Sequence, residues 1–152
     1  GYRAPGFSVS PNMSWVFDIL SDQGYEYDSS YLYSRKDYIH KLGNGLIQVP
    51  PNSLSILSKE IPTCGGFFFR LCPLSIYTAY VSRINNKKVP LIFYTHSWEI
   101  YPSKNRLRLP LIKYFIQYYN LNSVQKKFIK LADNFEFLSI RDYINLNGTE
   151  IY

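Results

Sequence analysis

One short segment of the sequence brings together side chains that could carry out acid–base chemistry. Residues 89–100 read V-P-L-I-F-Y-T-H-S-W-E-I, so His96, Trp98 and Glu99 directly follow an apolar run. A histidine has an ordinary pKa of about 6.5, and its imidazole can therefore give or take a proton at neutral pH. A histidine that only ends a strand and bonds to the backbone fits the same position. His96 is the first candidate catalytic residue, with that structural role as the alternative.

The apolar run before His96 predicts the element that positions it. Residues 91–94 are too few for a buried helix, are rich in β-forming types and follow Pro90, which favours a strand buried on both faces. Such strands belong to parallel sheets, where catalytic groups lie just past the carboxyl ends of the strands. We therefore expect His96, Trp98 and Glu99 on a single surface at such an edge.

A second set of candidates stands near the start of the chain. Arg3 lies at the end of a predicted strand, and its guanidinium is suited to a bidentate grip on a carboxylate. A helix is predicted from Ser10 as N-cap, with Pro11 in its first position, to Gly24, and a short strand follows at residues 25–30. Strand, helix and strand form a βαβ unit, which puts Arg3 and Asp28 on the same rim. An arginine on a loop surface and an aspartate in a turn are the alternatives.

The rest of the pattern predicts further short elements. Residues 31–45 are predicted to form a long loop, in which His40 is expected to be exposed and without a role. The other predicted elements are a strand pair at 46–49 and 54–57, helices at 71–85, at 111–119 and from 122 or 123 to about 134, a strand at 135–140 and a terminal helix from 140. Residues 67–69 are three consecutive phenylalanines, which cannot all point inward from one strand, so one ring or more is expected to line a groove. Gly65 and Gly66 permit close backbone approach to a ligand or to another chain segment. With Arg70 they are candidates for holding a polar, neutral ligand.

Composition sets the outer limits. The chain has 152 residues, 46% of them hydrophobic, which suits one domain or part of one. Its net charge of +6 comes from scattered basic residues, which favours a solvated surface over a nucleic-acid site. The two cysteines lack a metal-binding spacing and are interpreted as core residues, with a disulfide left open. No run reaches the roughly 18 apolar residues of a membrane span, and no cleavable signal opens the chain.

Three segments, taken in order, resemble the later motifs of the polysaccharide deacetylases. They are G-Y-R-A-P at residues 1–5, Y-D-S-S at 27–30 and F-Y-T-H-S-W-E at 93–99. Residues 45–50, G-G-F-F-F-R at 65–70 and the tail through Phe137 are similar to the branch with a C-terminal extension found in bacterial exopolysaccharide systems. The resemblance implies an α/β fold: the C-terminal portion of a distorted (β/α) barrel, with a small β-hairpin insertion and C-terminal helices. Residues 1–44 would supply the late barrel βαβ unit and loop, and residues 45–152 the extension with the last barrel strand.

The resemblance also implies a reaction, the hydrolysis of N-acetyl groups on a poly- or oligosaccharide. A divalent metal, usually zinc, would be held by motifs that precede the Arg-x-Pro element, so the ligands are expected outside this chain. Arg3 would orient the catalytic aspartate, His96 would protonate the leaving amine as general acid, and Asp28 would tune His96. The remaining substrate contacts are assigned to Trp98, which would wall the acetyl pocket, and to Glu99, Tyr2, Pro5, Gly66 and Arg70.

Two departures and one alternative accompany this interpretation. Ser97 stands where the family commonly has proline, and I-Q-Y-Y at residues 116–119 stands where an arginine–histidine pair is common. The aromatic loops and the missing upstream motifs also fit a non-catalytic glycan-binding or scaffolding remnant. Residues 1–152 alone are expected to be inactive. The polymer, the metal, the oligomeric state and the location, in the cytoplasm or at the cell envelope of a bacterium, stay open.

Overall fold

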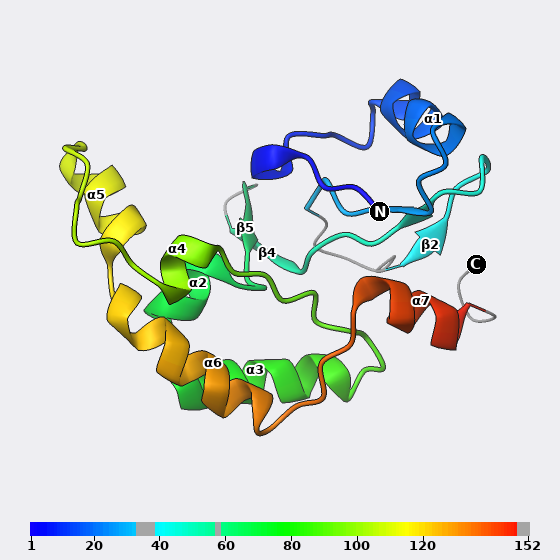
Figure 1. Ribbon diagram of the computed structural model, residues 1–152. Coiled ribbons are helices and arrows are strands. Elements are labelled where there is room, and N and C mark those ends of the chain that lie inside the picture. Colours follow the sequence, from blue (N-terminus) through cyan, green and yellow to red (C-terminus); the bar gives the residue numbers. More distant parts are fainter. Residues whose placement is uncertain (33–38, 57–58, 149–152) are drawn as a thin grey trace. The chain divides into compact units, whose positions relative to one another are not determined.

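The computed structural model describes residues 1–32, 39–56 and 59–148 (Figure 1). The chain divides into two compact units, each with an apolar core of its own. Unit 1 comprises Gly1–Pro62 and Leu138–Tyr152, and unit 2 comprises Thr63–Phe137. The described residues form a mixed α/β fold with small sheets and no closed barrel. The α/β class is thereby confirmed, and the predicted division at residues 44 and 45 stays a prediction.

Unit 1 is built on a small three-stranded sheet. Its strands β1 (Tyr27–Asp28), β2 (His40–Lys41) and β3 (Ile47–Gln48) lie in the order β1-β3-β2. Strand β3 is parallel to β1 and antiparallel to β2. Tyr2 adds a parallel bridge to Asp28 on the outer side of β1. A helix connects Tyr2 to this parallel partner, so the order and direction of the predicted βαβ unit are confirmed, whereas its first strand is reduced to a single bridge.

The connecting helix, α1 (Ser14–Asp22), is preceded by a short 3-10 helix, η1 (Pro5–Phe7). It begins four residues after the predicted N-cap, and no side chain caps its start. Its end is as predicted: Gly24 has φ of 76°, and its N–H donates to Ser21 O at 2.9 Å while Tyr25 N–H donates to Leu20 O at 3.0 Å. This pair of bonds is a Schellman motif, which needs a residue that tolerates positive φ.

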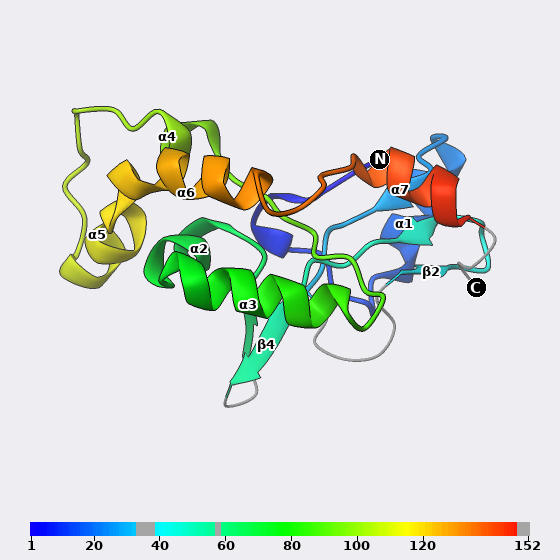
Figure 2. The same cartoon turned by 90° about the horizontal axis from the view of Figure 1, so that it is seen from below.

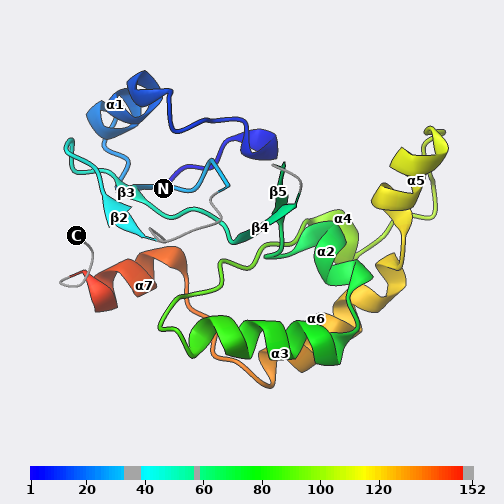
Figure 3. The same cartoon turned by 180° about the vertical axis from the view of Figure 1, so that it is seen from behind.

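Helices α1 and α7 (Ile140–Asn147) lie on opposite sides of the sheet of unit 1 (Figures 1 and 3). On the α1 side, Phe17 and Leu20 pack against Tyr31 and Leu46 to form the core of the unit. The start of α7 is capped by Ser139, whose hydroxyl accepts a hydrogen bond from Asp142 N at 3.1 Å. The predicted terminal helix is confirmed, whereas the predicted strand at residues 135–140 is wrong, because residues 135–139 form an irregular connection.

A separate hairpin joins β4 (Ser53–Ile56) to β5 (Lys59–Pro62) as antiparallel strands. The hairpin was predicted, but its pairing was not: β3 pairs within the three-stranded sheet and not with residues 54–57. Pro50 and Pro51 explain the difference, since consecutive prolines fix φ and have no N–H to close a tight turn. They form a buried, extended connection instead. Position 57, predicted as part of the pair, lies outside the described residues.

Unit 2 is helical. Its elements are α2 (Gly66–Leu71), α3 (Leu74–Asn85), α4 (Ser97–Ile100), α5 (Leu111–Tyr118), η2 (Leu121–Ser123) and α6 (Val124–Ala132). Helices α3 and α6 lie side by side (Figure 2), and their residues Tyr77, Val81, Val124 and Leu131 form the buried core with Phe69 of α2. The predicted helices that became α3, α5 and α6 are confirmed. Within the described chain no helix has the length and apolar character needed to cross a membrane.

Two apolar runs of unit 2 lie in or against helices. Helix α2 directs its three phenylalanines to different sides, in agreement with the expectation that they cannot all point inward from one strand. Residues 91–94 are half-buried, and among the described residues they make one parallel bridge, between Tyr94 and Gly65. Phe93 packs against Phe69 and Phe128 of neighbouring helices, with ring centroids at 5.1 and 5.6 Å. The expectation of a strand buried on both faces is wrong because helices cover this run.

Candidate functional site

The His96 imidazole is exposed and lies between two aromatic rings of its own segment. The ring is stacked on Trp98, with centroids 5.6 Å apart and an angle of 11° between the planes. Tyr94 meets it edge-on, at 5.9 Å and 75°. His96 occupies the N-cap position of α4. The predicted general acid is therefore accessible to solvent, and its neighbours restrict the orientation of the ring.

The backbone at His96 is fixed by the carboxylate of Glu99. Glu99 Oε2 accepts a hydrogen bond from His96 N at 3.0 Å and one from Thr95 Oγ1 at 3.4 Å. This is the reciprocal half of a capping box, in which a glutamate three residues into a helix bonds back to its start. Glu99 is 1% exposed. His96 and Glu99 thus do not share one surface as predicted, because the helical turn directs one side chain to solvent and the other inward.

Arg70 is the buried partner of Glu99. Its Nε lies 3.0 Å from Glu99 Oε1, and both side chains are almost fully buried. Its Nη1 and Nη2 donate to three carbonyls at the end of α5: Ile116 O at 2.8 Å, Gln117 O at 3.1 Å and Tyr119 O at 2.8 Å. Burial lowers the pKa of the guanidinium, and the charge of Glu99 raises it. The arginine caps the negative end of a helix dipole while paired with a carboxylate.

Aromatic contacts connect this buried pair to the exposed histidine. The Arg70 guanidinium carbon lies 5.7 Å from the Trp98 ring and 5.6 Å from the Phe67 ring. Trp98 therefore contacts both the imidazole of His96 and the guanidinium of Arg70. The visible roles of Arg70 and Glu99 are structural, and their predicted substrate contacts stay predictions.

The glycine pair brings α2 against the residue two positions before His96. Tyr94 N donates to Cys64 O at 3.0 Å, and a Cβ added to Gly65 would lie 1.9 Å from Tyr94 O. Gly66 has φ of 52°, and its added Cβ would lie 3.2 Å from the Tyr94 hydroxyl. The predicted close approach is therefore confirmed for a chain segment. The predicted ligand contact of Gly66 stays untested.

Arg3 lies in unit 1 on the rim of the βαβ unit. Its Nε donates to Ser29 O at 3.1 Å and its Nη2 to Ser29 Oγ at 2.7 Å. Tyr2 packs edge-on against Tyr25, and Pro5 opens η1. The structure thus brings the first motif and residues 28–30 together, as the βαβ prediction requires. The roles predicted for Arg3, Tyr2 and Pro5 toward substrate stay predictions.

Asp28 is fully buried and forms an Asx-type turn with Ser30. Its Oδ2 accepts from Ser30 N at 3.1 Å, and its Oδ1 accepts from the Ser30 hydroxyl. Burial raises the pKa of the carboxyl, and the hydrogen bonds from Ser30 oppose this rise. The geometry matches the turn that was the alternative for Asp28. A tuning role toward His96 stays a prediction.

The histidine that shares a sheet row with Asp28 is His40. In the register of the sheet, Asp28 pairs with Gln48, and Gln48 pairs with His40. Gln48 is 1% exposed, and a hydrogen bond from its side chain acts to lower the pKa of the Asp28 carboxyl. His40 is half-buried, so the expectation that it is exposed is wrong. The alternation of Leu46 and Gln48 could have indicated a buried polar position, but sequence reasoning missed it.

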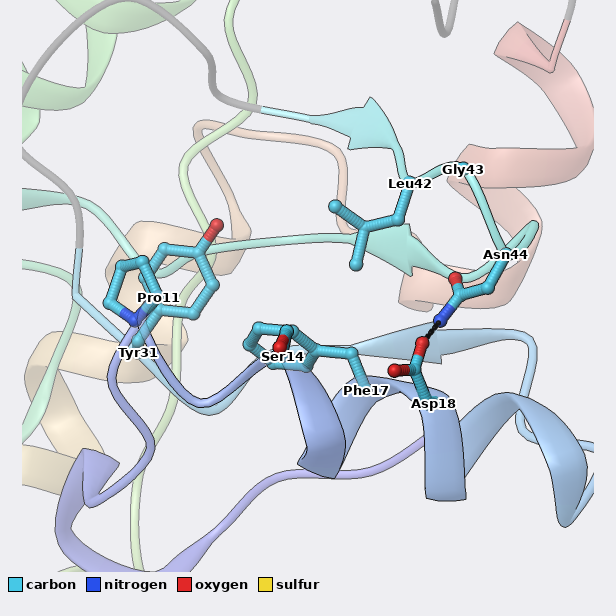
Figure 4. Close-up of a pocket in the computed structure, with 8 residues that line it drawn as sticks. All are labelled: Pro11, Ser14, Phe17, Asp18, Tyr31, Leu42, Gly43 and Asn44. Carbon is cyan, nitrogen blue, oxygen red and sulfur yellow. Dashed lines mark hydrogen bonds between the residues drawn. The ribbon is translucent and has the colours of Figure 1, made fainter.

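A pocket of about 350 Å³ opens in unit 1 between α1 and the turn after β2 (Figure 4). A hydrogen bond of 2.9 Å from Asn44 Nδ2 to Asp18 Oδ1 closes one side. The lining residues are Pro11, Ser14, Phe17, Asp18, Tyr31, Leu42, Gly43 and Asn44. None of the residues predicted from the motifs lines this pocket.

The described residues do not fit a metal centre. Among them, no group of three or more histidine, cysteine, aspartate or glutamate side chains could hold an ion. No disulfide joins Cys64 and Cys72 in the described part of the chain, and Cys64 is buried. The side chains of the described residues therefore supply no metal-dependent step.

No curated protein and no solved structure matches the chain. A family model described as a domain of unknown function, DUF3473, matches residues 27–145. This range includes β1, the whole of unit 2 with the His96 segment, and the first part of α7. Since the match covers most of the sequence, the chain belongs to the DUF3473 family.

Proposed function

We propose that this chain is the acid-bearing part of a metal-dependent enzyme that removes N-acetyl groups from a poly- or oligosaccharide. The ordered motifs around Arg3, Asp28 and His96 support the proposal, as does the association of the DUF3473 family with polysaccharide deacetylase-like proteins. In this proposal the chain supplies the C-terminal portion of a distorted (β/α) barrel. In this proposal the metal is held by family motifs that the described residues do not contain.

The observation that carries the proposal is the exposed, oriented imidazole of His96. Amide hydrolysis needs an acid near neutral pH, because the nitrogen must gain a proton as it leaves. In the proposed reaction water gives one proton to the catalytic aspartate implied by the resemblance and adds to the acyl carbon. The carbon–nitrogen bond breaks, and the imidazolium of His96 gives its proton to the sugar nitrogen. Acetate and a free amine are the products. The indole of Trp98, stacked beside the imidazole at 5.6 Å, offers an apolar wall for the acetyl methyl group.

The test is acetate release by the full-length protein that contains this chain. Replacing His96 with alanine removes the proton donor and is expected to lower kcat by about 10²- to 10⁴-fold. The fall in rate at high pH, where a general acid loses its proton, should disappear in the same variant. Added imidazole should restore part of the rate. Tyr101→Ala is a matched control, because Tyr101 ends the same short helix and is 75% exposed.

Full turnover by His96→Ala would reject the assignment of the acid. Loss of activity in both variants would indicate damage to α4 and would not support a proton-transfer role. An unchanged circular dichroism spectrum of His96→Ala would show that its loss of activity comes from the missing proton donor and not from unfolding. A second check is the sequence preceding Gly1, where the proposal requires an aspartate-bearing strand end and a histidine pair.

The alternative is a module that binds glycans without cleaving them. The exposed imidazole stacked on Trp98 favours it, because sugar rings pack on flat aromatic surfaces. This alternative predicts that calorimetry detects saccharide binding in the presence of a chelator. Trp98→Ala should abolish this binding, and the full-length protein should release no acetate. Absence of binding to any N-acetylated oligosaccharide would contradict this alternative.

A further inference from the structure

Helix α5 of unit 2 exposes an unusual amount of aliphatic surface. None of its eight residues, all within the described chain, is fully buried. Leu111 is 85% exposed and Ile112 is 75% exposed, and Leu107 in the preceding loop is 70% exposed. We call these three residues the aliphatic tip. Large aliphatic side chains that are this exposed and this close in sequence mark a candidate contact site for a partner or a membrane.

The aliphatic tip is presented by an ordered scaffold. On one side of α5, Phe115 and Tyr119 pack against Phe67 of α2, with ring centroids at 5.9 and 6.4 Å. On another side, Tyr118 Oη accepts from Leu107 N at 2.9 Å, which ties the loop to the helix. The loop and the helix therefore form one element, anchored to α2 through aromatic rings.

The same loop adds a second attachment and a charge. Arg106 Nη1 donates to Tyr114 Oη at 3.1 Å, and its guanidinium lies 5.1 Å from the Tyr118 ring. These tyrosines place polar hydroxyls beside the apolar surface. Tyrosine is the type of side chain enriched where a protein meets the boundary between lipid headgroups and acyl chains.

The charge around the aliphatic tip has one sign. Between Glu99 and Asp133 the sequence contains no aspartate or glutamate. The basic residues of this stretch nearest to the tip are Lys104, Arg106, Arg108 and Lys113. An exposed apolar surface is thus surrounded in sequence by cations without a compensating anion.

We propose that the aliphatic tip docks on the surface of a bilayer that contains anionic lipids. The cations would attract lipid phosphates, and the leucine and isoleucine side chains would enter the boundary between headgroups and acyl chains. A soluble polyanion would satisfy the cations and leave the aliphatic side chains in water, whereas a neutral bilayer would satisfy only the aliphatic side chains. The proposal is independent of the deacetylase assignment, because it uses no residue of the His96 segment.

The test is sedimentation of the chain with phosphatidylcholine vesicles, prepared with and without phosphatidylglycerol. The unmodified chain should bind the anionic vesicles more tightly, and added salt should weaken this binding. The double variant Leu111→Gln/Ile112→Gln should weaken it at least about tenfold, because it removes the apolar groups that enter the boundary. Its matched control is Ile76→Gln/Ile129→Gln, which changes side chains that are 59% and 54% exposed on α3 and α6.

The charge contribution is tested separately. The triple variant Lys104→Gln/Arg108→Gln/Lys113→Gln should weaken binding by roughly 100-fold, since each cation near an anionic surface contributes a factor of several. Its matched control removes three cations at the end of α3 by changing Arg83, Lys87 and Lys88 to glutamine, and should bind nearly as the parent does.

An inserted fluorophore distinguishes immersion from adsorption. Tryptophan at position 112, Ile112→Trp, should show a blue-shifted emission with anionic vesicles, relative to the parent protein, and Ile76→Trp should not. The proposal is overturned if the chain does not bind anionic vesicles or binds neutral vesicles equally tightly. It is overturned as well if the test variants and their control variants lose the same amount of vesicle affinity. It is also overturned if Leu111→Gln/Ile112→Gln instead converts a dimer to a monomer, because the tip would then be an interface between copies.

Discussion

At the scale of single residues, Glu99 holds the candidate site together. One carboxylate oxygen bonds to the backbone of His96 at 3.0 Å, and the other lies 3.0 Å from Arg70 Nε. Through Arg70 the same carboxylate is connected to the last carbonyls of α5. The general-acid candidate and the aliphatic tip thus depend on one buried ion pair, whose members are 29 residues apart in the sequence.

We expect Glu99→Gln to lower the free energy of unfolding by about 3 kcal/mol, because it leaves a buried guanidinium without its counter-charge. Glutamine keeps the shape of the side chain and can still accept from His96 N, so the loss reports the ion pair. Urea unfolding of the variant and the parent protein measures this difference in the free energy of unfolding. Glu136→Gln, an exposed change in the same unit, should alter the stability by less than about 0.5 kcal/mol. Equal stability of both variants would contradict the role of the pair.

At the scale of elements, the contact between the start of α2 and Tyr94 fixes where the His96 segment begins. Gly65 forms a parallel bridge with Tyr94, and its lack of a side chain permits the close approach. The neighbouring phenylalanines then occupy three sides of α2, with Phe69 in the core and Phe67 facing α5. This one helix connects the core of unit 2, the His96 segment and the scaffold of the aliphatic tip.

Gly65→Ala should destabilise unit 2 by about 3 kcal/mol, the upper range for a group forced into a packed site, because the added carbon meets the Tyr94 carbonyl. The NMR resonance of the Tyr94 amide should also change its chemical shift in Gly65→Ala. Gly43→Ala is the control, since a Cβ there has no neighbour within 4 Å among the described residues. The two variants are compared by thermal unfolding and by their NMR spectra. If Gly65→Ala is as stable as the parent, Tyr94 can move away at little cost in free energy.

At the scale of the whole molecule, the chain has two apolar cores. Phe17, Leu20, Tyr31 and Leu46 form the core of unit 1, and Val81 belongs to the core of unit 2. The core of each unit is formed by residues of that unit alone. A change inside one core should therefore act first on the unit that contains it.

Val81→Ala should weaken unit 2 by about 2 kcal/mol through the loss of buried apolar groups and the cavity left behind. Amide hydrogen exchange should then accelerate at Val124 and Leu131 and stay unchanged at Leu20. Leu46→Ala should give the reciprocal pattern. A uniform acceleration throughout the chain in either variant would indicate a single cooperative unit.

Sequence alone determined the features that depend on a few neighbouring residues. Gly24 predicted the end of α1, because a residue that tolerates positive φ is a local requirement. Pro73 and Pro110 stand at the N-cap positions of α3 and α5, where the missing proline N–H costs no helical hydrogen bond. The exposed histidine of the candidate site was likewise found from a motif of neighbouring residues.

Only the tertiary structure decided what each apolar run packs against. Residues 91–94 were predicted as a strand from their apolar composition, yet they lie against helices with a single described bridge. Burial of apolar surface is non-directional, so a run of such residues does not specify its partner. The pairing of Arg70 with Glu99, and the row of Asp28, Gln48 and His40, also depend on distant segments meeting in the fold.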